Sequence, residues 1–498
     1  MSIIDKLAEM RDFGGSRNTT GLSDEIIRDF AIRDTNLVDA VNDAFQIFTE
    51  LKQRFPKVLA QDETDQINTI QADFVNFYAD DAINPYVALA ASGPWIVTSK
   101  GAVVHDNGGY GMLGFGHTPE AVIGSMSKNQ VMANIMTPHF SQLRFIKALE
   151  REVGHTRGSC PFHGFLCLNS GSESVSVAAR ISDINAKLAT DPGATHSNKK
   201  IRHVALEGGF HGRTDRPAQY SDSTRSTYKA HLASFRDQDN LLTVEPNNLE
   251  HLQQVFDKAE ADGYFIESMF IEPVMGEGNP GEAMTREFYD LARDLTAQHG
   301  SLLLVDSIQA GLRAQGCLSI LDYPGFEDID APDMETYSKA LNAGQYPLSV
   351  LAMTERAASL YRKGIYGNTM TTNPRALDVA CQVLSQVTPE LRETIRMKGQ
   401  EFVTKLKALA EELDGLITGV QGTGLLFSCE LHPDFKSYGT DSIEEYMRKK
   451  GVGVIHGGEN SLRYTPHFNV TSEEVDLIID ATRDALLKGP RAKQVQAA

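Results

Sequence analysis

Short apolar runs alternate with helical patterns along the middle of this 498-residue chain, and they constrain the fold more than any other feature. Each run is brief and bounded by Gly, Asp or Ser, as expected of strands buried on both faces of a parallel sheet. The helical segment 286–300 lies between two of them and ends in a glycine suited to a helix C-cap. The alternation therefore predicts an α/β domain with a mainly parallel sheet. The clearest runs are GFLCL (164–168), RHVAL (202–206), SMFIEPV (268–274) and SLLLVDS (301–307).

The two ends of the chain differ from this centre. The N-terminal part is acidic and helical, and one helix face is marked by apolar residues spaced three or four apart, Val41, Phe45, Phe48 and Leu51. From about residue 373 a long helical stretch precedes a mixed α and β region. We predict a helical segment with part of a small domain over 1–115, a large domain over 116–372, and the rest of the small domain over 373–498.

Composition limits the classes of function. The chain has 47 basic and 66 acidic residues, a formal charge of −19, which disfavours binding to nucleic acid or to an anionic membrane. The five cysteines are scattered without a CxxC pair, so free thiols in a reducing compartment fit better than disulfides or a zinc site. We see no apolar run of membrane-spanning length and no signal-peptide pattern at the start. We expect a cytoplasmic protein with no metal.

The segment Gly109–Gly114 matches the GxGxxG pattern of dinucleotide-binding turns. That pattern has to open a helix directly after a strand to hold a pyrophosphate. Here it runs into Phe115-Gly-His-Thr-Pro119, which does not suit such a helix start. The segment is therefore predicted to be a close-packed loop.

A second motif, Asn169-Ser170-Gly171-Ser172-Glu173, lies between the GFLCL run and a helical segment. Small residues at such a turn leave backbone N–H groups pointing outward at the positive end of a helix. The turn is therefore either a phosphate cradle or an ordinary helix cap.

Three further motifs also have two interpretations each. Phe210 and His211 lie in a Gly-flanked loop, where they either stack on a flat ring or simply form a turn. Asp306 ends an apolar run, where α/β proteins place ligand-binding residues, although a helix N-cap is equally consistent. Lys339 has small and apolar neighbours; a desolvated lysine there is a nucleophile, whereas an isolated lysine is ordinarily a solvated surface charge.

Taken together, the order and spacing of these motifs resemble the class III (ω-amino acid) aminotransferases, which use pyridoxal 5′-phosphate (PLP), and within them the lysine, ornithine and 4-aminobutyrate group. The resemblance covers about residues 90–485. NSGSES is similar to that family's NSGTEA, GFHGRT to YHGRT, and IEPVMGEG (271–278) to VEPIQGEG. DSIQAGLR resembles DEVQTGxGR, and YSKAL resembles FSKxxGGG. GNTMTTNP (367–374) resembles GHTFSGNP, and LRYTPHFNVT (462–471) resembles IRFxPPLxIT.

The resemblance implies the type I PLP-enzyme fold, with a large domain built on a mainly parallel seven-stranded sheet and a smaller α+β domain. It also implies a homodimer with each active site at the subunit interface. The implied function is ping-pong transfer of the terminal amino group of an ω-amino acid or diamine to a 2-oxo acid, 2-oxoglutarate first. An aminomutase or decarboxylase on the same fold, or a non-enzymatic binding protein, remains an alternative.

The same resemblance implies roles for the residues around the cofactor ring. Lys339 matches the lysine that bonds covalently to PLP, and Asp306 matches the aspartate paired with the pyridine nitrogen. Gln309 matches the glutamine that contacts the ring hydroxyl. Phe210 matches the aromatic residue that stacks on the ring, with His211 beside it.

Other residues match the phosphate site. Gly171 and Ser172 match the phosphate-binding turn, and Thr369 matches a threonine that reaches the phosphate from the partner subunit.

Three residues are implied to bind substrate. Arg463 matches an arginine that pairs with the α-carboxylate of glutamate. Glu277 matches the glutamate that neutralises this arginine while the ω-amino donor is bound, which predicts a switch between the two half-reactions. Tyr110 resembles in position a substrate-facing tyrosine of ornithine-type members.

The sequence also departs from the family pattern. Ser307 replaces a glutamate, Gln421 stands where an arginine is usual, and the 106–117 segment is shorter than the corresponding family segment. These differences bear on the choice of substrate and leave the cofactor residues nearly complete.

Overall fold

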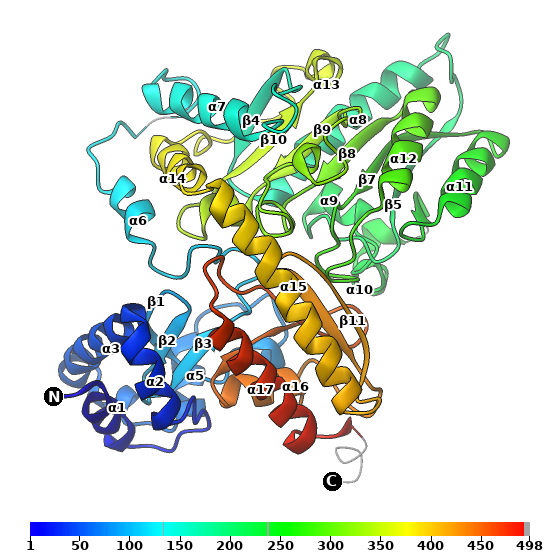
Figure 1. Ribbon diagram of the computed structural model, residues 1–498. Coiled ribbons are helices and arrows are strands. Elements are labelled where there is room, and N and C mark those ends of the chain that lie inside the picture. Colours follow the sequence, from blue (N-terminus) through cyan, green and yellow to red (C-terminus); the bar gives the residue numbers. More distant parts are fainter. Residues whose placement is uncertain (133, 237–238, 493–498) are drawn as a thin grey trace. The chain divides into compact units, whose positions relative to one another are not determined.

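The computed structural model describes residues 1–132, 134–236 and 239–492 (Figure 1). These residues form two compact units. The first comprises residues 1–120, 397–421 and the segment from 427 to the C-terminal part, and the second comprises 121–396 and 422–426.

The second unit is built on a sheet of seven strands among the residues described. Five neighbouring strands, β9, β8, β7, β5 and β6, run parallel to one another. Strand β10 is antiparallel to both of its neighbours, β4 and β9. This confirms the predicted mainly parallel α/β sheet. In spatial order the strands are β4 (Gly164–Leu168), β10 (Ser349–Met353), β9 (Met334–Tyr337), β8 (Leu302–Asp306), β7 (Tyr264–Ile271), β5 (Lys200–Leu206) and β6 (Leu241–Val244).

All four predicted runs fall on strands of this sheet, as β4, β5, β7 and β8. The expectation of burial on both faces holds for β7 and β8, but not for β4, where four of the five residues are only half-buried. The reason is position: β4 is an edge strand with a neighbour on one side only. An apolar run alone does not distinguish an edge strand from a central one.

Helices of the second unit connect and cover these strands (Figure 1). Helix α8 places Val175, Ala178 and Ile181 in a core cluster with Phe270 of β7 and Leu304 of β8. The predicted helix at 286–300 is confirmed as α12, and Gly300 ends it in the left-handed conformation (φ 76°). The helices are α7 (Phe140–Glu152), α8 (Gly171–Thr190), α9 (Asp215–Tyr220), α10 (Arg225–His231), α11 (Leu249–Ala261), α12 (Arg286–His299), α13 (Glu355–Leu360) and α14 (Pro374–Ser385).

The first unit combines N-terminal helices with two small sheets. Its N-terminal helices are α1 (Ile3–Asp12), α2 (Asp24–Arg33), α3 (Thr35–Arg54), α4 (Pro56–Leu59) and α5 (Glu63–Gln71). One sheet has the order β1 (Ala88–Ser92), β2 (Trp95–Thr98), β3 (Val103–Asp106) and β13 (Val452–Gly453). The other has the order β11 (Ile417–Thr423), β12 (Leu426–Leu431), β15 (Ser461–Tyr464) and β14 (Ile455–Gly457). Helices α16 (Ile443–Lys449) and α17 (Ser472–Lys488) complete it, while α6 (Glu120–Met126) and α15 (Pro389–Glu412) span the unit boundaries.

The predicted apolar helix face is confirmed in part on α3. Val41 and Phe48 are fully buried, while Phe45 and Leu51 are half-buried. The GxGxxG segment is confirmed as a loop, in which a Cβ added at Gly114 would meet the Phe468 ring at 2.4 Å. Among the residues described, no helix is long and apolar enough to cross a membrane.

Candidate active site

Apart from Thr369, which lies between α13 and α14, the sequence-predicted cofactor residues of the second unit lie at or just after the carboxyl ends of its strands. Asp306 is the last residue of β8, opposite Thr336 of β9, and Lys339 follows β9 directly. Loops after neighbouring parallel strands meet at one edge of the sheet, where α/β proteins bind their ligands. The topology therefore gathers these residues although they are far apart in sequence.

Asp306 and His211 form a buried pair. The Oδ2 atom of Asp306 lies 2.8 Å from Nδ1 of His211, and both side chains are almost fully shielded from solvent. Because a carboxylate only accepts hydrogen bonds, His211 carries its proton on Nδ1. The other carboxylate oxygen accepts the backbone N–H of Ile308 at 3.1 Å. No helix begins directly after Asp306, since the described residues that follow it form turns, so the helix N-cap interpretation is wrong and Asp306 belongs to a buried polar pair.

Glu272 holds the Phe210 loop in place, and the sequence analysis missed it. Its carboxylate accepts the backbone N–H groups of Phe210 at 3.0 Å and of Gly276 at 2.9 Å. Burial raises the pKa of Glu272 to about 7. The available signal was its position directly after strand β7, inside the IEPVMGEG motif.

The Asn169–Glu173 turn caps helix α8. The Ser170 hydroxyl accepts the Glu173 N–H, while the Gly171 and Ser172 N–H groups belong to the first turn, which has no intrahelical acceptors. A Cβ added at Gly212 would approach the Ser172 hydroxyl to 2.5 Å, so the GFHGRT loop packs against this turn. The structure thus brings the predicted phosphate turn and the predicted ring-stacking loop together.

Gln309 and Lys339 complete this group. Gln309 is buried, and a Cβ at Gly276 would meet its side-chain carbon Cδ at 2.3 Å, so a larger residue at 276 would displace the Gln309 side chain. Lys339 is half-buried and has a left-handed backbone (φ 43°) at the start of a 3-10 turn ending at Asn342. A non-glycine residue in this conformation is uncommon and often found at functional sites.

Ser307, one of the departures from the family pattern, faces the protein interior. Its hydroxyl donates to Glu335 of β9 at 2.6 Å, and Glu335 also accepts hydrogen bonds from the Ser319 and Tyr337 hydroxyls and the Ile320 N–H. Burial raises the pKa of Glu335 to about 7. Ser307 therefore contributes to a buried polar network beneath the loop that follows Asp306.

Thr369 and Glu277 also lie in the second unit. Thr369 is among the residues that line a cavity of about 630 Å³ together with Ile135, Met136 and Cys167. Glu277 has an ion-pair partner within its own unit, Arg213 of the GFHGRT loop, at 3.4 Å.

Arg463 and Tyr110 belong to the first unit, and the structure brings them together. Arg463 is 2% exposed on β15, and its guanidinium lies 5.9 Å from the centre of the Tyr110 ring. Tyr110 has a left-handed backbone (φ 52°), and burial raises its pKa to about 12. The predicted pairing of Glu277 with Arg463 joins residues of different units and stays a prediction.

The residues of the second unit fit a PLP molecule. The N-terminal end of α8 suits its phosphate, the buried Asp306 suits a protonated pyridine nitrogen, and Lys339 is a primary amine for the aldehyde. In addition, Nε2 of His211 is buried without a hydrogen-bond partner among the described residues, as expected beside a site that a ligand fills. Fold and site together are those of a type I PLP-dependent transferase.

The profile of the family described as Aminotransferase class-III matches residues 77–486. The chain is 32% identical over 321 residues to a succinylornithine transaminase of Citrobacter koseri, a match covering 64% of this chain and 72% of the relative. The chain therefore belongs to the class-III aminotransferase family, and it is a PLP-dependent transaminase.

Solved structures agree on the fold. The ornithine aminotransferase of Toxoplasma gondii superimposes with a TM-score of 0.71 at 19% identity, covering 85% of this chain and 94% of that one. The acetylornithine aminotransferase of Elizabethkingia anophelis gives a TM-score of 0.68 at 21% identity, covering 86% and 99%.

Proposed function

We propose that this enzyme moves the terminal amino group of an ω-amino acid or diamine of the ornithine type to 2-oxoglutarate by a ping-pong mechanism. The observation that carries the proposal is the buried Asp306–His211 pair at the strand ends, next to the loop of Lys339. The class of amine is supported by the Citrobacter relative, whose name specifies succinylornithine. Ornithine and Nα-succinylornithine are therefore the first donors to test.

The proposed chemistry assigns each group one task. PLP, when bound, withdraws electrons from the reacting carbon of the substrate. Lys339 takes a proton from that carbon and returns it later, and Asp306 keeps the proton on the pyridine nitrogen. His211 orients the Asp306 carboxylate through the 2.8 Å contact. Gly171 and Ser172 would hold the phosphate, Phe210 would pack on the ring and Gln309 would bind the ring hydroxyl.

Substrate binding is assigned to Arg463, Tyr110 and Glu277. A planar guanidinium binds a carboxylate with two parallel hydrogen bonds, so Arg463 suits the α-carboxylate of glutamate and 2-oxoglutarate. While an ω-amino donor is bound, Glu277 is the proposed counter-charge of Arg463, and it releases Arg463 for the second half-reaction.

The proposed assembly is a homodimer in a reducing, cytoplasmic compartment. Ile135, Met136 and Phe140 are between 63% and 79% exposed near the cavity that contains Thr369. If a second copy of the chain covered this apolar surface, Thr369 of each copy would approach the phosphate site of the other copy. Residues 116–372 are the proposed cofactor domain, with 1–115 and 373–498 as the small domain; the second compact unit begins at 121 and also takes in 373–396 and 422–426.

Separate half-reactions test the proposal. Donor alone should bleach the visible absorption of the holoenzyme, and subsequent 2-oxoglutarate should restore it with one glutamate formed per site. Arg463→Ala should impair the 2-oxoglutarate half far more than the donor half, and Arg463→Lys should recover only part of the loss, because lysine lacks the fork geometry. Glu277→Ala should do the reverse.

Three results would contradict the proposal. An amine product isomeric with the donor and no glutamate would indicate an aminomutase, and loss of carbon dioxide would indicate a decarboxylase. Equal damage to both half-reactions in the Arg463→Ala and Glu277→Ala variants would reject the switch and leave the two residues with a structural role.

A further inference from the structure

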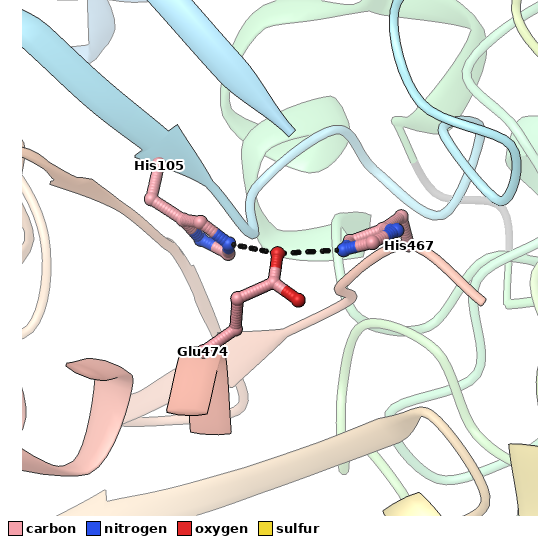
Figure 2. A group of neighbouring side chains, drawn as sticks. All are labelled: His105, His467 and Glu474. Atoms are coloured by element: carbon pink, nitrogen blue, oxygen red, sulfur yellow. Dashed lines mark hydrogen bonds and ion pairs between the residues drawn. The ribbon is translucent and has the colours of Figure 1, made fainter. Parts of the chain in front are cut away.

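Two histidines and a glutamate, none of which has been given a role above, converge inside the first unit (Figure 2). Oε1 of Glu474 lies 2.9 Å from Nε2 of His105 and 2.9 Å from Nε2 of His467. His105 comes from strand β3, Glu474 from the first turn of α17, and His467 from the segment between β15 and α17. Three potential metal ligands thus meet from three separate parts of the chain.

The cluster is buried, yet one side remains accessible. His105 is fully buried and Glu474 is 3% exposed, whereas the His467 side chain is 14% exposed. Two imidazole nitrogens and one carboxylate oxygen, largely shielded from solvent, are a donor set that zinc binds in proteins.

Two of the three side chains are held in orientation by a second contact. The other carboxylate oxygen of Glu474 accepts the backbone N–H of Thr471 at 2.7 Å, which leaves Oε1 for the histidines. On His105, Nδ1 lies 3.0 Å from the side-chain amide of Asn107. Metal-binding histidines and carboxylates in proteins are commonly fixed by such outer contacts.

The Asn107 contact accommodates both proton positions of His105. The amide nitrogen of Asn107 currently donates to Nδ1, which places the imidazole proton on Nε2. Rotating the amide by half a turn brings its oxygen to Nδ1, so the proton can move there and release Nε2 as a ligand. In this rotation the amide oxygen gives up no hydrogen bond among the described residues, while the amide nitrogen gives up a long contact of 3.5 Å with the His105 backbone oxygen.

The spacing is close to that of a zinc site. The three ligand atoms all lie within 4.8 Å of one another. Tetrahedral zinc with bonds of about 2.1 Å separates its ligand atoms by about 3.4 Å, so the two 2.9 Å contacts of Glu474 widen by about 0.5 Å and the remaining pair comes closer by about 1.4 Å or less. Two histidines and one glutamate leave a fourth position, which water can fill from the exposed side of His467.

We propose that His105, His467 and Glu474 form a binding site for a divalent late first-row metal ion, Zn²⁺ foremost. The bound ion ties the end of β3 to the start of α17. Asn107 follows His105 by two residues, and Thr465 follows Arg463 by two residues. The backbone oxygen of Asn107 accepts the backbone N–H of Thr465 at 2.8 Å. The ion therefore stabilises the strand ends next to Arg463, and no step of the transamination requires it.

The test uses full-length holoenzyme, cleared of metal with a chelator and then equilibrated with micromolar Zn²⁺. Metal content per chain and the thermal unfolding temperature are measured for the wild type, His467→Gln, Glu474→Gln and the control His456→Gln. His456 makes a comparable 2.9 Å contact with Glu444, but no second histidine joins that pair. The glutamine amide at 467 can still donate to Glu474, so this variant retains the hydrogen bond and is expected to fold.

We expect one Zn²⁺ per wild-type chain and a higher unfolding temperature with metal. Loss of a ligand in His467→Gln or Glu474→Gln should weaken binding by about 100-fold or more and abolish the thermal shift, while His456→Gln behaves as wild type. Failure of the wild type to bind Zn²⁺ would overturn the proposal and leave a hydrogen-bonded cluster. Equal binding by His467→Gln would also overturn it, since the metal would then lie elsewhere.

Discussion

Replacing Asp306 by asparagine tests the buried pair on which the proposed chemistry depends. The shape of the side chain is kept while its charge is removed, so a pyridinium proton loses its counter-ion. Removing one partner of a buried ion pair costs about 3–5 kcal/mol. Applied to the reacting state, this cost corresponds to a fall in turnover of roughly 150- to 5,000-fold.

The same substitution should lower stability by a predictable amount. Asp306 accepts hydrogen bonds from both His211 and the backbone N–H of Ile308, and an asparagine oxygen can serve only one of them. A buried donor without a partner costs about 1–3 kcal/mol. Urea unfolding of the variant should show this loss as a lower free energy of unfolding. The slope of that free energy against urea concentration should stay unchanged.

Asp333 provides a matched control. It is a buried carboxylate at the opposite end of β9, where it accepts hydrogen bonds from Arg293, Arg356 and the Leu303 N–H. Asp333→Asn should lose stability but keep its turnover per folded, PLP-loaded molecule. Turnover of Asp306→Asn within a few-fold of the wild type, measured as glutamate formed by PLP-saturated enzyme, would refute the assigned role of Asp306.

Three further predictions concern residues around this pair. Ser307→Ala removes one of the four hydrogen-bond donors to buried Glu335. The variant should unfold in urea with a free energy lower by about 1–3 kcal/mol and keep its turnover per folded molecule. An unchanged midpoint of urea unfolding would contradict this prediction. Because the pKa of Glu335 is raised to about 7, the native state binds more protons than the unfolded state between pH 4.5 and 7. As the pH rises through this range, the wild type should therefore lose up to roughly 3 kcal/mol of unfolding free energy relative to Glu335→Gln. Stability curves of the two proteins that stay parallel would refute this prediction. Thr369→Ala should speed PLP loss on dialysis relative to the exposed neighbour control Met370→Ala, and equal retention would remove Thr369 from the phosphate site.

The sequence was sufficient to predict the sheet because its signal is local. Runs such as SLLLVDS are apolar in a continuous stretch of strand length, and a glycine marks the end of α12. The loop at Gly109–Gly114 could be distinguished from a dinucleotide turn for the same reason, since the residues that follow it do not begin a helix.

The partners within the candidate site were harder to predict. His211 and Asp306 are 95 residues apart, and their contact depends on the order of β5, β7 and β8 in the sheet. Glu272 directly follows strand β7, and Glu335 lies within strand β9. A single acidic residue at such a position gives no periodic signal in the sequence.

The metal-site candidate was missed for a related reason. His105 and Glu474 are 369 residues apart, and His467 lies seven residues before Glu474 and outside its helix, so the pair matches no single-helix ligand motif. Metal sites are recognised in sequences by short ligand spacings, which this arrangement lacks. All three side chains belong to the first unit, which joins distant parts of the chain.

The most direct test of the central claim is reduction of the purified holoenzyme with borohydride, followed by peptide mapping. We predict that the yellow colour is lost and that one PLP-derived group is fixed covalently to Lys339, whereas Lys339→Ala carries no such adduct. An adduct on a different lysine, or an adduct that persists in Lys339→Ala, would contradict the account of this active site.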